Sequence, residues 1–441
     1  MKKIFIILIA VLFCNFCLGQ NADIKRLIKK AENGDAASMN SLGAMYYNGN
    51  GVPQDYKKAA EWWEKAAEKG NVDAMLDLGV CYSNGDGVPY DIQKTFEWFR
   101  KASEKGDSRA MFNIGSMYYN GNGVSQNSQK AFEWFAKAAE KGNVEAMYYL
   151  GDGYLRVGNY TKTYEWWEKA AREGDTRVLC DLAGMCRTGK GVSQDMKKAF
   201  EWYTKAAKEG NTQAMYSLGL MCSEGQGVQR DYGKAIEWWK KAAEEGNVSA
   251  MYNIGWLYDN INGDVVLQVR NTSKAMEWYA KAAEKGHVKA MSELGRLYFV
   301  YQFSHMKAIE WWEKAAEKGD ASAMNGLGYI YYKGMRDVPQ NYKTASEWFT
   351  KAQKKGDSYA KGFLSEMYYY GYYVTKDYNK AFKLAKESAE DKNDPSGTAM
   401  RILSACYRYG VGGVPIDNNK AEYWLKKSAN YMDEIAMRLM E

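Results

Sequence analysis

Residues 58–79 read KAAEWWEKAAEKGNVDAMLDLG, and close variants of this stretch recur about every 36 residues to the end of the chain. In its first half, Ala59, Trp62 and Ala66 fall at helical spacing, which predicts an apolar stripe along one side of a helix. Lysine and glutamate residues occupy the opposite side, as on a solvated helix face. We call this element the tryptophan helix.

The second half of the stretch predicts a stop and a further helix. Gly70 suits the position just after a helix end, where a left-handed backbone is easy for glycine. Asn71 suits the N-cap of the next helix, because its side-chain oxygen can accept from a free backbone N–H. In that next helix, Gly79 lets a neighbouring helix come close. We call this second element the glycine helix.

Repetition of the two helices predicts the fold. A loop with two glycines, residues 83–89 in this copy, closes the glycine helix, and Asp91 is placed to cap the next tryptophan helix. One helix pair leaves an apolar face uncovered, whereas stacked copies bury that face in each other. We therefore predict an all-α solenoid of about eleven antiparallel helix pairs, with about 36 residues per repeat.

The repeats organise almost the whole chain of 441 residues. We predict a solenoid over residues 20–441, with an N-terminal capping helix at 23–34, repeats over 35–430 and a further C-terminal helix at 431–441. The net charge of +6 is close to balance, and the basic residues alternate with glutamate. This pattern argues against a nucleic-acid partner.

The N-terminus has the layout of a signal peptide. It reads MKKIFIILIAVLFCNFCLGQ, in which two lysines precede an apolar run from Ile4 to Phe13 that is short for a membrane span. We predict a signal peptide over residues 1–19 with cleavage after Gly19, and an exported mature chain without a membrane span. A lipoprotein anchor on Cys14 or Cys17 is the less favoured alternative, because a bulky phenylalanine precedes each cysteine.

Beyond that leader the chain has an odd number of cysteines at irregular spacing, which does not indicate a disulfide framework. Most of them replace core residues of the repeat, so we predict buried free thiols. A disulfide between adjacent repeats, or a reactive or metal-bound thiol, stays an alternative. The five cysteines are Cys81, Cys180, Cys186, Cys222 and Cys406.

The repeated pattern AMxxLGxxYxxGxGVxxDYxKAxEWWxKAAEKGN resembles the SEL-one-like repeat (SLR), a short relative of the tetratricopeptide repeat. The resemblance covers the chain from Asp23 to its end. It implies antiparallel helix pairs wound into a right-handed superhelix with a concave face. It also implies an adaptor or scaffold, since such repeats usually bind other proteins and seldom catalyse reactions.

Several copies depart from the pattern. The fourth and eighth copies have shortened loops at 153–162 and 299–306, and the seventh has an insertion at 259–271. Loops absorb such changes at small cost, so the stack should persist. The VVLQV run of the insertion could form a short extended segment or an ordinary loop. The tenth copy has Leu384 and Ala385 in place of the paired aromatics.

Fourteen of the fifteen tryptophans lie on tryptophan helices. They could form an aromatic platform for a ligand such as a carbohydrate, or they could fill the core. Because both residues of each aromatic pair fall near the alanine stripe, we predict that both rings pack in the core, where each would remove roughly 150–250 Å² from water.

Side chains that vary between copies are the better guide to a binding surface. On the glycine helix we take the outer line as the positions equivalent to Asn40, Ala44 and Tyr47. Exposed aromatics on a rigid ladder offer contact area for a partner. We predict a groove for an extended peptide or a partner helix; the alternative is that tight winding buries these rings. The predicted groove residues are Phe112, Tyr148, Tyr216, Tyr252, Trp256 and Tyr329.

Nothing in the sequence indicates catalysis, a cofactor or a metal. His287 stands at a helix N-cap and His305 in a shortened loop, and no Cys/His cluster has zinc spacing. The paired glycines follow helices, so they are turn residues and not a phosphate-binding loop. We expect a monomeric, non-catalytic scaffold for a protein or peptide. One alternative is a cell-wall-related enzyme with penicillin-binding or β-lactamase-like activity, as linked to a cysteine-rich branch of the family; another is a purely architectural envelope protein.

Overall fold

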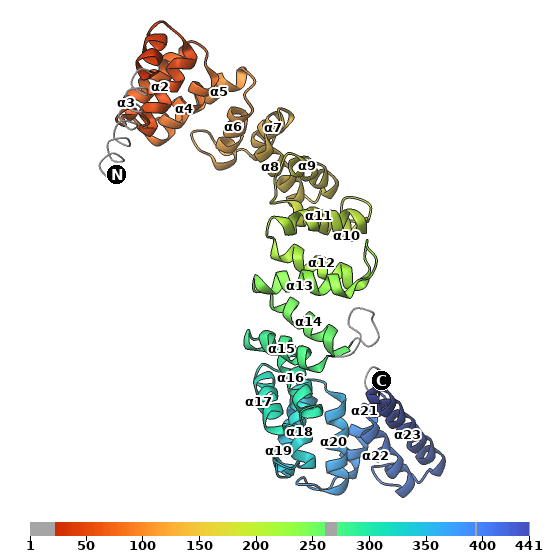
Figure 1. Cartoon of the computed structure of the whole chain (residues 1–441). Coiled ribbons are helices and arrows are strands. Elements are labelled where there is room, and N and C mark those ends of the chain that lie inside the picture. Colours follow the sequence, from red (N-terminus) through yellow and green to blue (C-terminus); the bar gives the residue numbers. More distant parts are fainter. Residues whose placement is uncertain (1–22, 261–270, 393–394, 441) are drawn as a thin grey trace, which may run out of the picture. The chain divides into compact units, whose positions relative to one another are not determined.

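The computed structural model describes residues 23–260, 271–392 and 395–440, and helices dominate these ranges. Twenty-two helices, α2 to α23, follow one another as eleven pairs in the described part of the chain (Figure 1). Met335 and Val338 form an isolated antiparallel bridge. The predicted all-α repeat fold is confirmed. The predicted signal peptide and the VVLQV run lie outside the described residues.

The chain divides into two units, Met1–Gly210 and Asn211–Glu441. In the first unit, glycine helices alternate with tryptophan helices in the order α2 (Ala36–Asn48), α3 (Tyr56–Glu68), α4 (Val72–Asn84), α5 (Ile92–Glu104), α6 (Ser108–Asn120), α7 (Ser128–Glu140), α8 (Val144–Arg156), α9 (Tyr160–Arg172), α10 (Leu179–Thr188) and α11 (Met196–Lys208).

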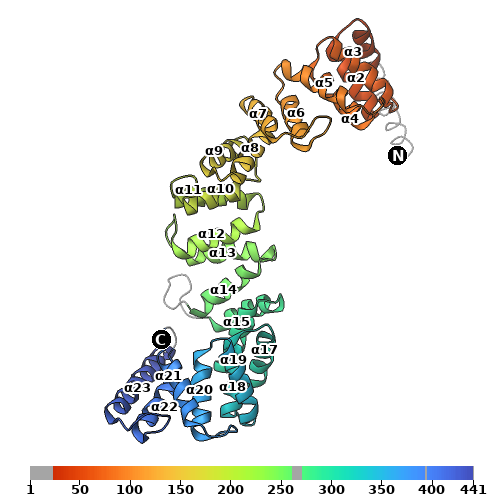
Figure 2. The same cartoon turned by 180° about the vertical axis from the view of Figure 1, so that it is seen from behind.

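The second unit has the same alternation, and Figure 2 shows its helices from behind. Its elements are α12 (Thr212–Glu224), α13 (Tyr232–Glu244), α14 (Val248–Asn260), α15 (Thr272–Glu284), α16 (Val288–Val300), α17 (His305–Glu317), α18 (Ala321–Lys333), α19 (Tyr342–Lys354), α20 (Ser358–Tyr370), α21 (Tyr378–Ala389), α22 (Gly397–Tyr409) and α23 (Asn418–Met440).

Neighbouring copies share one face made by the glycine helices. Each glycine helix packs on the tryptophan helix that follows it, and most also pack on the one before, as α4 does on α3. Some glycine helices contact the next glycine helix as well: α2 with α4, α16 with α18, α18 with α20, and α20 with α22. We call the exposed side of these helices, in either unit, the glycine-helix face. Side chains on this face are positioned by a regular array rather than by flexible loops.

Side-chain caps set the helix ends where the sequence predicts them. Asn71 Oδ1 accepts from the backbone N–H of Ala74 at 2.8 Å, and Asp91 Oδ1 accepts from that of Lys94 at 3.0 Å. Gly70 has a φ of 88°, in the left-handed region that favours glycine. Each cap satisfies a backbone N–H that has no partner inside its helix.

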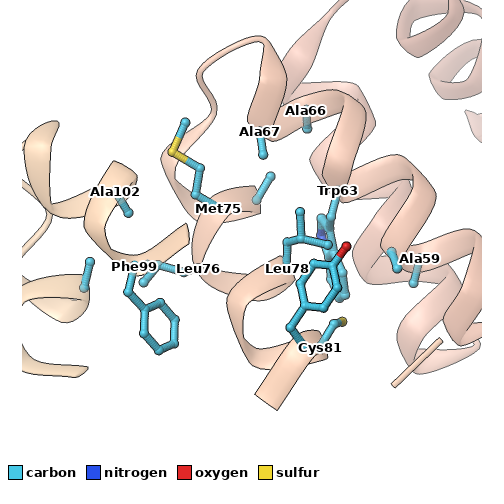
Figure 3. Close-up of a cluster of buried hydrophobic side chains, with 14 of the residues drawn as sticks. Ala59, Trp63, Ala66, Ala67, Met75, Leu76, Leu78, Cys81, Phe99 and Ala102 are labelled. Atoms are coloured by element: carbon cyan, nitrogen blue, oxygen red, sulfur yellow. The ribbon is translucent and has the colours of Figure 1, made fainter. Parts of the chain in front are cut away.

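A close contact between a glycine and an aromatic ring recurs in eight copies. A β-carbon built on Gly79 would lie 2.6 Å from the ring of Phe99, which is buried, so the ring fills the space that any larger residue would need. Figure 3 shows Phe99 beside Leu76 in this core. The pairs are Gly43–Trp63, Gly79–Phe99, Gly115–Phe135, Gly151–Trp167, Gly219–Trp239, Gly255–Tyr279, Gly295–Trp312 and Gly328–Phe349.

The first ring of each aromatic pair behaves differently, and the prediction that both rings pack in the core is confirmed only in part: in most copies this ring is half-buried, and Trp62, Trp98 and Trp134 pack against the core from its edge. Trp62 is half-buried, and Lys65 Nζ lies 4.6 Å from the centre of its ring, a cation–π contact. Adjacent residues of a helix point about 100° apart, so the second ring, Trp63, is buried while Trp62 lies at the edge of the same core. The same lysine contact recurs at Trp98, Trp134, Trp166, Trp238, Trp278, Trp311 and Trp348, and at Trp202, which is buried.

The second loop glycine touches the preceding copy. A β-carbon on Gly87 would lie 2.1 Å from the carbonyl oxygen of Tyr56, in the first turn of α3. In the tenth copy Tyr373 occupies this loop position with a φ of 63° and an exposed ring. A tyrosine in the left-handed region is conformationally strained. The replacement of the loop glycine in this copy therefore costs conformational energy. In the same copy Leu384 and Ala385, which replace the aromatic pair, are buried.

Both ends of the array extend the helical pattern. Residues 23–32 are helical, inside the predicted capping helix, and Leu27 and Ile28 pack on the first core. At the other end α23 runs without a break from Asn418 to Met440, so the residues from 431 onward continue the last tryptophan helix instead of forming a separate one. The glycine that ends most other tryptophan helices, such as Gly70 after α3, is missing here, where residues 428–431 read SANY.

Candidate partner-binding face

All six predicted groove residues lie on glycine helices, but they differ in exposure. Trp256 is 46% exposed, and the other five are half-buried. They also belong to both units, with Phe112 and Tyr148 in the first and the rest in the second. The six residues therefore fall into two sets, one in each unit.

The strongest patch lies over α12 and α14. Tyr252 and Trp256 are one helical turn apart on α14, and Asn253 Nδ2 of the same helix donates to the hydroxyl of Tyr216 on α12 at 3.3 Å. These contacts bring three of the predicted residues, Tyr216, Tyr252 and Trp256, onto two neighbouring glycine helices. We call these three residues the Trp256 patch.

The ring of Tyr252 is held in place by contacts with two other rings. Its ring stacks on that of His287, with ring centres 4.6 Å apart, and lies 5.6 Å from the ring of Tyr279. Burial, followed by the nearby Glu293, raises the pKa of Tyr252, so its hydroxyl stays protonated at neutral pH. The exposed indole of Trp256 therefore stands beside a rigid aromatic base.

The remaining predicted residues are partly used by packing, which is the alternative foreseen for them. Phe112 lies 5.5 Å from the ring of Phe135 and 5.7 Å from that of Tyr149. Tyr329 lies 5.6 Å from the ring of Phe363. The hydrophobic rings of both residues are engaged by neighbouring copies, and only part of each ring is open to a partner.

The ring of Tyr148 makes a cation–π contact with Arg177. The guanidinium of Arg177 lies 4.2 Å from its ring centre, and Arg177 also pairs with Glu145 Oε2 at 3.1 Å and Asp175 Oδ2 at 2.7 Å. This network links α8 to the start of the fifth copy. The carboxylates keep the pKa of Arg177 raised, against the effect of burial.

No charged residue was predicted for the groove, although Arg296 and Asp259 lie on its outer line. On α16, Arg296 Nε donates to Glu293 Oε2 at 2.6 Å, and the guanidinium also pairs with Asp259 at the end of α14. Burial acts to lower the pKa of Arg296, but these two carboxylates outweigh it and raise that pKa. On α4, Asp77 is half-buried and lies one residue outside the predicted line. Asp77 and Glu293 share one repeat position, and the side chain at that position varies between copies. This variation is the signal that could have pointed to both carboxylates.

The two histidines have structural contacts. His287 Nδ1 accepts from the backbone N–H of Ala290 at 3.1 Å, which is the N-cap role predicted for it. His305 contacts the carboxylate of Asp337 in the loop after α18. The described residues include no group of three or more His, Cys, Asp or Glu side chains placed to hold a metal ion.

The five cysteines after the predicted leader are free. Cys180 is half-buried and the other four are buried, which confirms most of the prediction. Burial raises the pKa of Cys81 to about 12 and that of Cys406 to about 11. Because the thiolate is the reactive form, raised pKa values make these thiols poor nucleophiles. No described helix is both long enough and apolar enough for a membrane span.

These features define a helical repeat array whose variable side chains lie on one helix face and whose invariant positions fill the core. The Sel1 repeat model matches eleven segments, residues 36–71, 72–107, 108–143, 144–175, 177–211, 212–247, 248–287, 288–320, 321–357, 358–393 and 397–430. The chain therefore belongs to the Sel1-repeat family, whose members are typically protein-interaction scaffolds and generally non-catalytic.

Solved structures of bacterial repeat proteins are similar to this chain. A protective antigen of uropathogenic Escherichia coli with an SLR fold is 33% identical at a TM-score of 0.72, covering 92% of this chain and 86% of that one. A Sel1 repeat protein from Oxalobacter formigenes is 27% identical (TM-score 0.44; 80% and 93% covered). Helicobacter pylori cysteine rich protein B is 24% identical (TM-score 0.23; 28% and 92% covered). Comparison with curated proteins gave no match.

Proposed function

We propose that this protein is an exported scaffold that binds a protein or peptide partner on its glycine-helix face, with Trp256 as the anchor. Trp256 is the one tryptophan outside the tryptophan helices, and the only one in the described residues that is exposed rather than buried or half-buried. Tryptophan is enriched among residues that dominate binding energy, particularly where a rigid surround excludes water. We propose that Tyr252, one helical turn away on α14, and Tyr216 on α12 supply that surround.

Export is supported by the sequence of residues 1–19, with its two lysines, apolar run and small residue at Gly19. The proposed mature chain begins at Gln20. Cell fractionation followed by N-terminal sequencing of the recovered protein tests this part. A cytoplasmic protein that retains Met1 would contradict it, and a lipid-modified N-terminal cysteine would favour the anchored alternative.

The binding proposal is tested by cross-linked affinity capture from the native host with three baits: the parent, Trp256→Ala and Trp238→Ala. Trp238 is half-buried on a tryptophan helix, so its variant controls for the loss of an indole elsewhere. We expect the Trp256→Ala bait to lose partners that the other two retain, with helical content and thermal midpoint like those of the parent. A partner set that is unchanged by Trp256→Ala would refute the anchor role.

A further inference from the structure

A polar cavity of about 460 Å³ opens on the glycine-helix face of the first unit. Three successive glycine helices supply its walls: α2, α4 and α6. The cavity is separate from the Trp256 patch, which lies on α12 and α14. Its lining residues are Asn40, Asp73, Leu76, Asp77, Arg109 and Asn113.

The charges around this cavity do not balance. Arg109 Nη2 donates to Asp73 Oδ1 at 2.6 Å and to Asp107 Oδ2 at 2.7 Å. The one guanidinium of the cavity is therefore already engaged by two carboxylates. Asp77 adds a third, so this group has an excess of negative charge when its members are ionised.

Two acceptors of the cavity lack donors. Within the described residues, no hydrogen-bond donor or cation contacts the carboxylate of Asp77. The amide oxygen of Asn40 is buried, and it likewise meets no donor in the described part of the chain. Burial and the nearby Asp73 raise the pKa of Asp77 to about 6, although Arg109 acts in the opposite direction. At neutral pH this carboxyl is still mostly ionised.

The eighth copy shows what satisfies a carboxylate at this position. Glu293 occupies the position of Asp77, six residues after the N-cap, and it accepts from the guanidinium of Arg296 at 2.6 Å. Arg296 itself stands three residues later on the same helix. In the second copy that later position is Val80, and the nearby Arg109 donates to Asp73 and Asp107 instead.

We propose that this cavity receives the ammonium or guanidinium group of a lysine or arginine side chain from the bound partner. Such a group supplies donors and positive charge together, which is what the carboxylate of Asp77 and the amide of Asn40 lack. The inference rests on the proposed function, because it assigns a side-chain preference to a second part of the glycine-helix face.

Short blocked peptides test the cavity without knowledge of the partner. The probes are Ac-Gly-Arg-Gly-NH2, Ac-Gly-Lys-Gly-NH2 and the uncharged Ac-Gly-Gln-Gly-NH2, each titrated into the mature protein with methyl-labelled leucine. Leu76 lines the cavity, so its methyl resonances report binding there. We expect saturable shifts with the two charged peptides and none with the glutamine peptide.

Two variants complete the experiment. Asp77→Asn keeps the shape of the side chain and removes its charge, and we expect it to weaken binding of the charged peptides at least about tenfold. Asp181→Asn changes the same repeat position in the fifth copy, outside the cavity, and should leave binding unchanged. Equal binding by the parent and Asp77→Asn, or no saturable shift with either charged peptide, would overturn the proposal.

The outcome is separable from that of the capture experiment. Loss of partners by Trp256→Ala, together with undisturbed peptide binding by Asp77→Asn, would leave the scaffold function standing and remove the basic-residue preference. Peptide binding that depends on Asp77, together with a partner set that ignores Trp256, would establish the cavity and refute the anchor.

Discussion

Gly219 lies directly under the indole of Trp239. A β-carbon built on Gly219 would be 2.2 Å from Trp239 Nε1, and that nitrogen donates to the carbonyl oxygen of Tyr216 at 3.1 Å. The glycine thus lets the ring come close enough to bond the backbone of the opposing helix. The same pairing recurs in eight copies, so it is a regular contact between the two helices of a repeat.

Alanine at Gly219 should destabilise the fold. The added methyl group would overlap the buried indole, and we expect the free energy of unfolding to fall by about 1–3 kcal/mol. Gly184 is the matched control, because it also lies inside a glycine helix but its β-carbon would meet only the Tyr203 hydroxyl, at 3.9 Å. Gly184→Ala should stabilise by up to about 1 kcal/mol through helix propensity. Urea unfolding of both variants checks this, and shifts of the same sign would argue against the ring contact.

The two rings of one aromatic pair should differ in their effect on stability. Trp239 is 2% exposed, and Trp239→Ala should lower the free energy of unfolding by about 3–5 kcal/mol. Trp238 is half-buried with Lys241 Nζ 4.4 Å from its ring centre, and Trp238→Ala should cost only about 1 kcal/mol. Chemical unfolding of the two variants under one set of conditions makes the comparison. Equal losses would restore the view that both rings are core.

The difference between these adjacent tryptophans shows which features of the fold the sequence could predict and which it could not. Caps such as Asn71 and Asp91 depend on a few neighbouring residues, so local pattern was sufficient to place them. Trp238 and Trp239 both fall near one apolar stripe, and only the crossing of two helices decides which ring enters the core. The spacing of apolar residues along one helix does not predict the angle at which two helices cross.

The candidate sites show the same limit. The outer position of Trp256 followed from helical geometry, and the structure finds it exposed. Asp77 was missed because it lies one residue off the predicted line, and because its importance comes from the lack of a hydrogen-bonded partner. Recognising it requires knowing that Arg296 neutralises Glu293 in one copy while Val80 cannot serve Asp77 in another.

Asp77 should make stability depend on pH in an unusual direction. Its pKa is raised to about 6 in the folded chain from an ordinary value near 3.8, so between these values the folded state binds more protons than the unfolded state. This carboxyl therefore removes stability as pH rises through that window. The charged groups around it are Asp73 on α4, and Asp107 and Arg109 at the start of α6.

Asp77→Asn isolates this effect. The variant should have a higher thermal midpoint than the parent at pH 7, and the difference should shrink as pH is lowered toward 4. Scanning calorimetry of both proteins across this range makes the measurement, and the difference cancels contributions from other carboxyls. A gap that widens toward acid pH would show that Asp77 has a stabilising partner.

His287 should make the stability of the fold depend on pH in the opposite direction to Asp77. Its Nδ1 accepts from the N–H of Ala290 only while the imidazole is neutral, and burial, followed by Lys289, lowers the pKa of His287. The unfolded chain, with a pKa near 6.5, then binds more protons below that pH, so this cap contributes stability above about pH 6.5 that is lost as pH falls toward the lowered pKa.

Asparagine fills the same cap in the second copy, at Asn71, and it does not titrate. His287→Asn should therefore remove part of the loss of thermal stability between pH 7 and pH 5. The variant also loses the stacking of His287 on Tyr252, but the main part of that loss is independent of pH and shifts the whole curve. The slope of the midpoint against pH is consequently the decisive quantity. A slope equal to that of the parent would mean that protonation of His287 does not release the cap.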